Sequence, residues 1–188
     1  GKAVAIILAL RDKDHPLEEG TRYNGMAMSL EQTARAAMNA KDGYHNTCGL
    51  DETAQTWADM QKLLNGLTVS QKMAKGCSKG HDHPAVNLCV NFDPGLTAAG
   101  KALYNYSSWF MPSYGQWLVG IQALGWKLLE SGNPYDLYKH NVENLKKLCS
   151  NKWGITYENT FTLFWTCSLK PKWNEDFIMA SPGFLMSS

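Results

Sequence analysis

The alternation of apolar and polar positions along this 188-residue chain predicts one early strand, several helices and a β-rich end. Ala3 to Leu10 is a continuous apolar run with β-branched residues, which is typical of a buried strand. Residues 11–25 are polar and carry Pro and Gly, so we expect a loop there. Apolar residues then recur at helical spacing in three segments. These segments begin at the capping box Ser29 to Gln32, at about Asp51 (ending near Leu64) and at Pro84.

The segment Ser107 to Trp117 predicts an abrupt change from extended chain to helix. Pro112 disfavours helical geometry at the residue before it. Ser113 and Gln116 have the spacing of a capping box, and an apolar helical face follows from Trp117 onward. Aromatic and apolar side chains at such spacing usually fill cores, so we expect a buried structural corner.

The remaining segments predict loops, one more helix and terminal strands. Residues 65–82 contain three glycines and are expected to form a loop. A helix is expected after Asn133-Pro134, and strands are expected at Phe161 to Ser168 and Phe177 to Ala180. We therefore predict a single α+β domain spanning residues 1–188.

Charge and cysteine content narrow the classes of function. The formal net charge is +1 and the basic residues are scattered, which argues against a nucleic-acid partner. No apolar run is long enough for a direct membrane span. The five cysteines form no CxxC pair, which argues against a dense disulfide framework and against common zinc spacings. Cys89 is expected to be a buried thiol on a helix face.

Candidate catalytic groups are few. His81-Asp82-His83 is the one cluster of metal-type ligands, but a catalytic zinc normally needs a third protein ligand, and solvated loop histidines are the expected alternative. No cysteine lies in a nucleophile signature, and there is no glycine-rich phosphate loop. We therefore expect a protein without enzymatic activity, cofactor or bound metal.

The best candidate for a binding surface is a predicted turn that presents one large aromatic side chain among polar ones. A tryptophan in this setting suits stacking on a sugar face or contact with a protein partner. The alternative is a Trp173 side chain folded back onto its own domain. A weaker candidate of the same kind surrounds Asn105. The predicted ligand-binding residues are Lys170, Lys172, Trp173, Asn174 and Glu175, with Tyr104 and Tyr106 from the second segment.

Four blocks follow one another along the chain: Asp42 to Thr47, Pro84 to Cys89, Trp109 to Trp117 and Phe164 to Ser168. In this order they resemble bacterial C-type-lectin-like domains of the Fibrobacter-succinogenes-major-paralogous type, which occur in secreted adhesins and fimbrial tip proteins of gut anaerobes. The corner Trp109 to Trp117 resembles the family's Trp-Tyr-Leu-Pro-Ser motif. Asp42 to Thr47 is similar to its Asp-Gly-x-x-Asn-Thr turn. Pro84 to Cys89 resembles its Pro-Ala-x-x-x-Cys helix, and Phe164 to Ser168 its Tyr-Trp-Ser-Ser segment.

The resemblance implies a compact C-type-lectin-like fold, with helices packed on a small twisted antiparallel sheet. It also implies that ligands bind after the segment that ends at Ser168, which is where the Trp173 turn lies. The chain departs from the family at several positions. Phe110 and Met111 replace the usual Tyr and Leu, and Cys167 stands in place of a Ser. No Glu-Pro-Asn-like ligand motif is present, so calcium-dependent sugar binding of the animal-lectin type is not expected. The usual closing strand with Arg-Pro-Val is absent before Ser188, so this strand is either missing or degenerate, and an upstream domain could likewise be missing.

Taken together, these features predict a secreted or outer-surface adhesin or ligand-binding domain. Its partner would be a glycan or a protein on a host or neighbouring cell, with other pilus subunits as a further candidate. Two alternatives remain open. One is an enzyme related to formylglycine-generating enzymes or a hydrolase, for which Cys167 would have to line an open pocket. The other is a purely structural pilus subunit.

Overall fold

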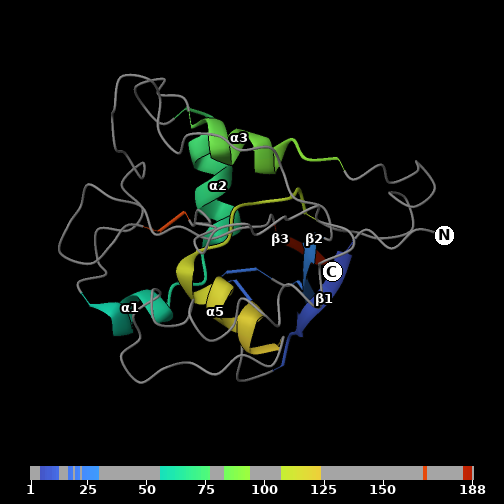
Figure 1. Cartoon of the computed structure of the whole chain (residues 1–188), viewed down its shortest axis with the longest axis vertical. Helices are drawn as coiled ribbons and strands as arrows, with labels where there is room; N and C mark the ends of the chain where they lie inside the picture. The colour runs from blue at the N-terminus through green and yellow to red at the C-terminus, as the bar shows by residue number, and fades with distance from the viewer. Residues whose placement is uncertain are drawn as a thin grey trace, which may run out of the picture.

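The structure is a computed structural model, and it describes residues 5–12, 17–18, 20–21, 23–29, 56–76, 83–93, 107–123, 167–168 and 184–187. In these ranges an antiparallel sheet lies beside α5 (Tyr114–Ala123), and α2 (Gly66–Ala74) and α3 (Pro84–Val90) lie on the other side of the corner segment (Figure 1). None of the helices in the described ranges has the length and apolarity required to cross a bilayer. These elements are too few to test the α+β C-type-lectin-like fold, which stays a prediction.

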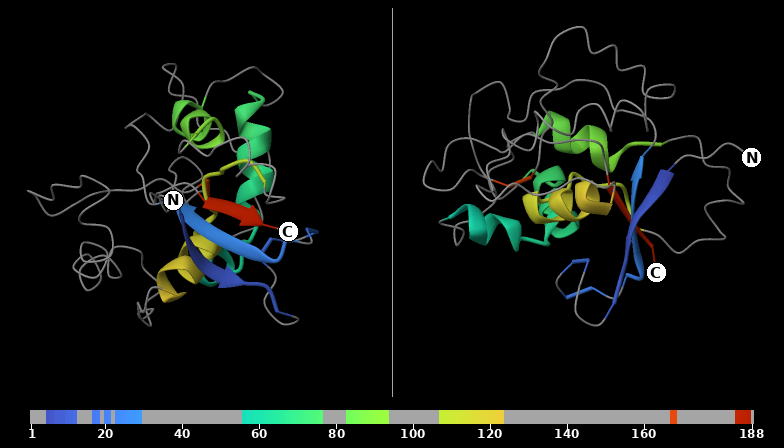
Figure 2. Two further views of the ribbon diagram at one scale, coloured as in Figure 1. Left: turned by 90° about the vertical axis from the view of Figure 1, so that its right-hand side faces the viewer. Right: turned by 60° about the horizontal axis from the view of Figure 1, so that its bottom comes forward.

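The sheet of the described residues has the order β1-β2-β3, with β1 at Ala5–Leu10, β2 at Gly25–Ser29 and β3 at Phe184–Ser187. Both pairings are antiparallel, and the two further views in Figure 2 show the three strands side by side. The predicted early strand is confirmed at β1. The pattern of apolar positions did not predict β2, which begins at the last residue of the predicted loop. The last strand carries no Arg-Pro-Val, yet it pairs with β2 along its whole length.

A β-bulge in β1 decides which of its side chains reach solvent. The register steps from Ile7 opposite Ala27 to Ala9 opposite Met26, so Leu8 is the extra residue. Without the bulge, Ile7 and Leu10 would point to opposite faces of the sheet. With it, both lie on the face away from Met26, with 69% and 71% of their surface exposed. The prediction of a fully buried strand was therefore wrong for these two side chains.

Three of the predicted helices are present in the described ranges: α3, α5 after the corner and, at a shorter length, α1. Helix α3 begins with Pro84 in its first turn, as expected, and buries Ala85, Val86 and Cys89. Helix α1 spans Trp57–Gln61 and is shorter than the predicted 51–64 element. Its N-cap is Thr56, which forms a capping box with Asp59, so the helix does not begin at Asp51.

Helix α2 contradicts the prediction of a loop at residues 65–82. Its buried positions, Gly66, Leu67, Val69, Ser70 and Met73, follow helical spacing. Two of the three glycines were misleading, because Gly66 lies at its first turn and Gly76 follows its end with φ of 83°; the third, Gly80, lies outside the described ranges. A glycine with positive φ is a common helix stop rather than evidence of a loop.

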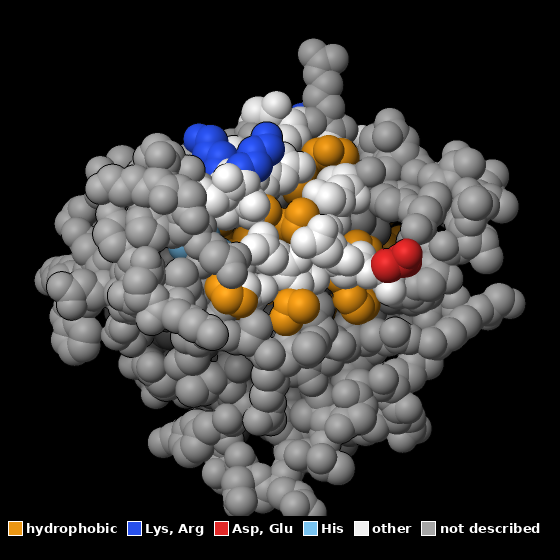
Figure 3. All heavy atoms as spheres, turned by 90° about the horizontal axis from the view of Figure 1, so that it is seen from above, with side chains coloured by type: hydrophobic (Ala, Val, Ile, Leu, Met, Phe, Trp, Pro, Cys, Tyr) orange, Lys and Arg blue, Asp and Glu red, His pale blue; other side chains and the backbone are white. Residues whose placement is uncertain are grey.

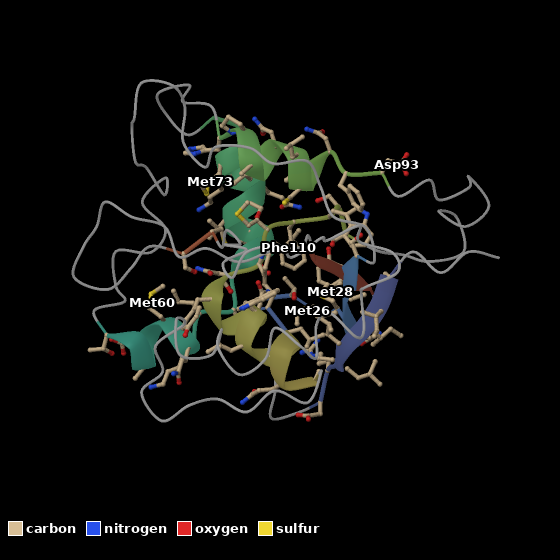
Figure 4. The ribbon with its side chains drawn as sticks, viewed as in Figure 1. Met26, Met28, Met60, Met73, Asp93 and Phe110 are labelled. Atoms are coloured by element: carbon tan, nitrogen blue, oxygen red, sulfur yellow. The ribbon has the colours of Figure 1, made fainter. Side chains whose placement is uncertain are left out.

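The core lies between the helical pair and the sheet. Phe110, on the corner segment, is fully buried, and Figure 4 shows it between Met73 of α2 and Met26 and Met28 of β2. Helix α5 packs on β1 and on α1, whereas α2 packs on α3. One hydrophobic cluster gathers residues from α2, α3, the corner and the segment at residue 167. Its buried members are Val69, Met73, Ala85, Val86, Cys89, Met111 and Cys167.

Other predictions fall on residues outside the described ranges. These are the helix after Ser29, the helix after Asn133, the strand at Phe177 to Ala180 and the turn at Asp42 to Thr47. Of the predicted strand Phe161 to Ser168, Cys167 and Ser168 are described, and neither is in a strand.

Candidate functional site

All of the predicted ligand-binding residues lie outside the described ranges. The described residue nearest to the Trp173 turn in sequence is Ser168. The part of the structure that bears on this turn is therefore the corner segment, together with Cys167 and Ser168, which contact the corner segment. The predicted residues outside the described ranges are Lys170, Lys172, Trp173, Asn174, Glu175, Tyr104 and Tyr106.

Cys167 and Ser168 are hydrogen-bonded to the corner on either side of Ser113. The backbone N–H of Cys167 donates to the Pro112 carbonyl over 3.0 Å. The backbone N–H of Tyr114 donates to the Ser168 hydroxyl, also over 3.0 Å. Cys167 and Ser168 are both fully buried. The chain therefore enters the predicted binding turn from a fixed point on the core.

The corner has the capping geometry that its sequence predicts. The Ser113 N–H donates to Gln116 Oε1 over 3.1 Å, and the Gln116 N–H approaches Ser113 Oγ at 3.5 Å. The Ser113 hydroxyl donates over 2.6 Å to the Leu63 carbonyl, which follows the end of α1. Trp109 packs edge-to-face on Phe92, with the ring centroids 5.4 Å apart. The prediction of a buried structural corner is confirmed.

Gln116 joins the corner to two distant segments, which its local role as a capping residue does not predict. Its Oε1 accepts from the Gly66 N–H at 3.0 Å, and its Nε2 donates to the Leu17 carbonyl at 2.9 Å. Nε2 also donates to Glu18 Oε2 at 2.9 Å. The donors around Oε1 and the acceptors around Nε2 leave one orientation of the amide that satisfies both. This side chain is fully buried.

The Ser70 hydroxyl joins α2 to the corner in a similar way. Its Oγ donates to the Met111 carbonyl and accepts from the Met111 N–H, both over 3.0 Å. One side chain thus satisfies both polar groups of a buried backbone residue. The buried serines Ser70 and Ser113 act as backbone partners here, and neither contacts a base in these bonds.

Two buried side chains, those of Cys89 and Tyr114, are held in their neutral forms. Burial raises the pKa of the Cys89 thiol from 9.0 to about 12. Burial also raises the pKa of the Tyr114 phenol. Cys89 and Cys167 are buried thiols outside any disulfide. A protonated thiol is a poor nucleophile, so Cys89 has the inert character expected from its place on the helix.

The structure corrects the expectation for one histidine of the His81-Asp82-His83 cluster. His83 is the N-cap residue of α3 and is fully buried, so it is not a solvated loop side chain. Its two neighbours lie outside the described ranges. Among the residues that the structure describes, no three His, Cys, Asp or Glu side chains gather as a metal site would require.

Two surfaces of the described residues carry exposed side chains that could meet a partner. The first lies over α2 and α3, where Figure 3 shows basic side chains among polar and hydrophobic ones. Lys72 of α2 and Lys75, its C-cap residue, are exposed. Such a mixture is typical of a solvated helical face. The second is the outer face of the sheet, where Ile7 and Leu10 are exposed. Aliphatic side chains that are exposed next to one another indicate a contact surface more strongly than single exposed ones do.

The sequence pattern does not point to Glu18, the buried charged residue of the described chain that contacts both Gln116 and α2. It lies in a polar loop, and no local pattern distinguishes it from the other charged residues of that loop. Its partners on α2 are 49 and 50 residues away in sequence.

No protein-family model matches the chain, and no curated protein or solved structure matches it. The resemblance to bacterial C-type-lectin-like domains therefore stays a prediction from the sequence blocks alone. Two of these blocks, the corner and the α3 helix, are fully described, and the end of a third block contacts the corner.

Proposed function

We propose that this chain is a non-enzymatic adhesin or ligand-binding domain of the outer cell surface, and that it binds a glycan or a protein through the turn Lys170 to Glu175. The observation that carries the proposal is the pair of hydrogen bonds that hold Cys167 and Ser168 on the corner. A contact surface gains affinity when its base is fixed before binding, because less conformational entropy is then lost. The turn starts two residues after this fixed point.

The composition of the turn supports the same proposal. Trp173 supplies a flat apolar surface, and the neighbouring lysines, Asn174 and Glu175 supply hydrogen-bonding groups. The side chains of Ser113 and Gln116 at the corner, by contrast, cap a helix and satisfy the backbone groups of Leu63 and Gly66. They therefore suit a scaffold, while the turn suits a binding surface.

The buried state of Cys167 counts against the rival hypothesis of an enzyme related to formylglycine-generating enzymes. That hypothesis needs the thiol to be open to a substrate, and the side chain has no exposed surface. Its sulfur faces the Gly66 carbonyl at 4.0 Å, within the core.

The test is a glycan array and a cell-adhesion assay on the wild type, Trp173→Ala and Lys172→Ala. We expect Trp173→Ala to lose binding by tenfold or more, because removing a stacked aromatic side chain from a contact centre is among the costlier substitutions at interfaces. Lys72→Ala is the matched control for Lys172→Ala, since Lys72 is exposed on α2. Circular dichroism and urea unfolding establish that each variant is folded. Binding by Trp173→Ala equal to that of the wild type, or no binding by either protein, contradicts the proposed site.

A structural pilus subunit is the second candidate, and the exposed pair Ile7 and Leu10 on β1 favours it. In that case the outer face of the sheet would meet a neighbouring copy of the chain. Sedimentation of the wild type and of the double variant Ile7→Ser/Leu10→Ser separates the two functions. Concentration-dependent association that the double variant abolishes supports the subunit, and a monomeric wild type up to millimolar concentration contradicts it.

A further inference from the structure

Helix α2 is capped by residues distant in sequence. Its N-cap residue, Asn65, makes no side-chain capping bond. The first N–H of the helix, from Gly66, donates to Gln116 Oε1. The next two donate to the Glu18 carboxylate: Leu67 to Oε2 over 2.9 Å, and Thr68 to Oε1 over 2.7 Å. The start of the helix therefore depends on side chains from two other segments.

Three donors converge on the Glu18 carboxylate, and each oxygen receives a backbone N–H. The third donor is Gln116 Nε2, which reaches Oε2 over 2.9 Å. Only 2% of the Glu18 surface is exposed. Backbone N–H groups at the first turn of a helix favour a negative charge, both by hydrogen bonding and through the helix dipole. The three donors thus have the chemistry of a carboxylate receptor, and it is enclosed by protein.

The position of Glu18 makes this contact a link between two parts of the structure. Glu18 lies in the connection between β1 and β2, and β1 packs on α5. Helix α2 packs on α3 instead. The Glu18 carboxylate therefore joins the β1–β2 connection to the first turn of α2. Figure 1 shows the relative places of α2 and the sheet.

We propose that the N–H groups of Leu67 and Thr68, together with Gln116 Nε2, form a carboxylate-binding site, with Glu18 as its internal ligand. When Glu18 is bound, the first turn of α2 is formed and the β1–β2 connection is held against it. When Glu18 leaves, both are released together. A site emptied by mutation accepts a small carboxylate such as acetate. This inference is independent of the proposed adhesin function.

The test measures amide hydrogen exchange at Leu67 and Thr68 in the wild type and in Glu18→Ala, with sodium acetate or sodium chloride at equal ionic strength. In chloride, we expect exchange at these two amides to be about tenfold faster or more in the variant, because each loses a charge-assisted hydrogen bond. Acetate slows the exchange in the variant and raises its Tm with saturable dose dependence. The wild type does not respond, because its site is filled.

The matched control is Asp59→Ala. Asp59 also caps a helix, accepting the Thr56 N–H over 3.0 Å, but in an exposed setting. Its removal leaves no enclosed receptor, so acetate and chloride should act alike on this variant. An acetate response of Glu18→Ala that is absent, or that Asp59→Ala shares, overturns the proposal.

A second variant covers the case in which Glu18→Ala does not fold in chloride. Folding of Glu18→Ala on addition of acetate then supports the site directly. Glu18→Gln keeps the volume and one acceptor oxygen, so it should fold, with exchange faster than that of the wild type at one or both amides. Wild-type exchange rates at Leu67 and Thr68 in Glu18→Gln overturn the proposal whatever the alanine variant does.

Discussion

Replacing Gln116 provides the most direct test of how this structure is held together. Its side-chain amide makes four hydrogen bonds, with the N–H groups of Gly66 and Ser113, the Leu17 carbonyl and the Glu18 carboxylate, and it is fully buried. The informative change is Gln116→Met, which keeps the length of the side chain and removes only its polar groups. Loss of stability in this variant therefore measures the hydrogen-bond network rather than a cavity.

The expected loss in the free energy of unfolding follows from the groups that lose their hydrogen-bond partner in Gln116→Met. Three backbone groups are affected: the N–H groups of Gly66 and Ser113, and the carbonyl of Leu17. A buried backbone group left unsatisfied costs about 1–3 kcal/mol. Some of this cost is recovered by relaxation, so we expect a loss of about 3–5 kcal/mol in the free energy of unfolding. A domain of this kind has about 5–15 kcal/mol in total.

Equilibrium urea unfolding, followed by tryptophan fluorescence, measures this loss as a lower midpoint. The control is Gln122→Ala, since Gln122 lies on the same helix and is exposed. Alanine is a slightly better helix former than glutamine, so the control should change stability by no more than about 0.5 kcal/mol. The reasoning is refuted if Gln116→Met loses less than about 1 kcal/mol, or if the two variants unfold at the same urea concentration.

Two further predictions concern close packing and alkaline pH. A Cβ atom at Gly66 would meet Gln116 Oε1 and would lie 2.5 Å from the Ser113 backbone nitrogen, so Gly66→Ala should lower Tm by several degrees in calorimetry. Gly20→Ala, where nothing lies within 4 Å but φ is 71°, should cost less, and equal losses would contradict the packing argument. The folded state holds the Cys89 proton up to a pKa of about 12, whereas an ordinary thiol releases it near 9.0. The contribution of the protonated Cys89 thiol to the free energy of unfolding is therefore fully present below pH 9. It is lost between pH 9 and 12, by up to about 1.4 kcal/mol per pH unit. Urea unfolding of Cys89→Ala should show a smaller slope in this window, and an unchanged slope would assign the loss to other groups.

Local signals in the sequence were sufficient to predict the corner and α3. Pro112, Ser113 and Gln116 act within four residues of one another, and Pro84 sets the start of its helix in the same way. Steric restriction by proline and capping by a near neighbour need no tertiary partner, so they can be read from the chain. The run that became β1 was predicted from its continuous apolar and β-branched residues, although not the exposure of Ile7.

Tertiary structure decided the features that depend on distant partners. Helix α2 was missed because its first N–H groups are capped by Gln116 and Glu18 rather than by its neighbours in sequence. The exposure of Ile7 and Leu10 required a bulge, which exists only when β1 pairs with β2. The sequence alone thus determined the corner and the start of α3, where proline and a near neighbour act within one turn of chain. Segments about 50 residues apart meet only when the core is formed, and the roles of Glu18 and of the glycine at position 66 were therefore settled by the folded structure.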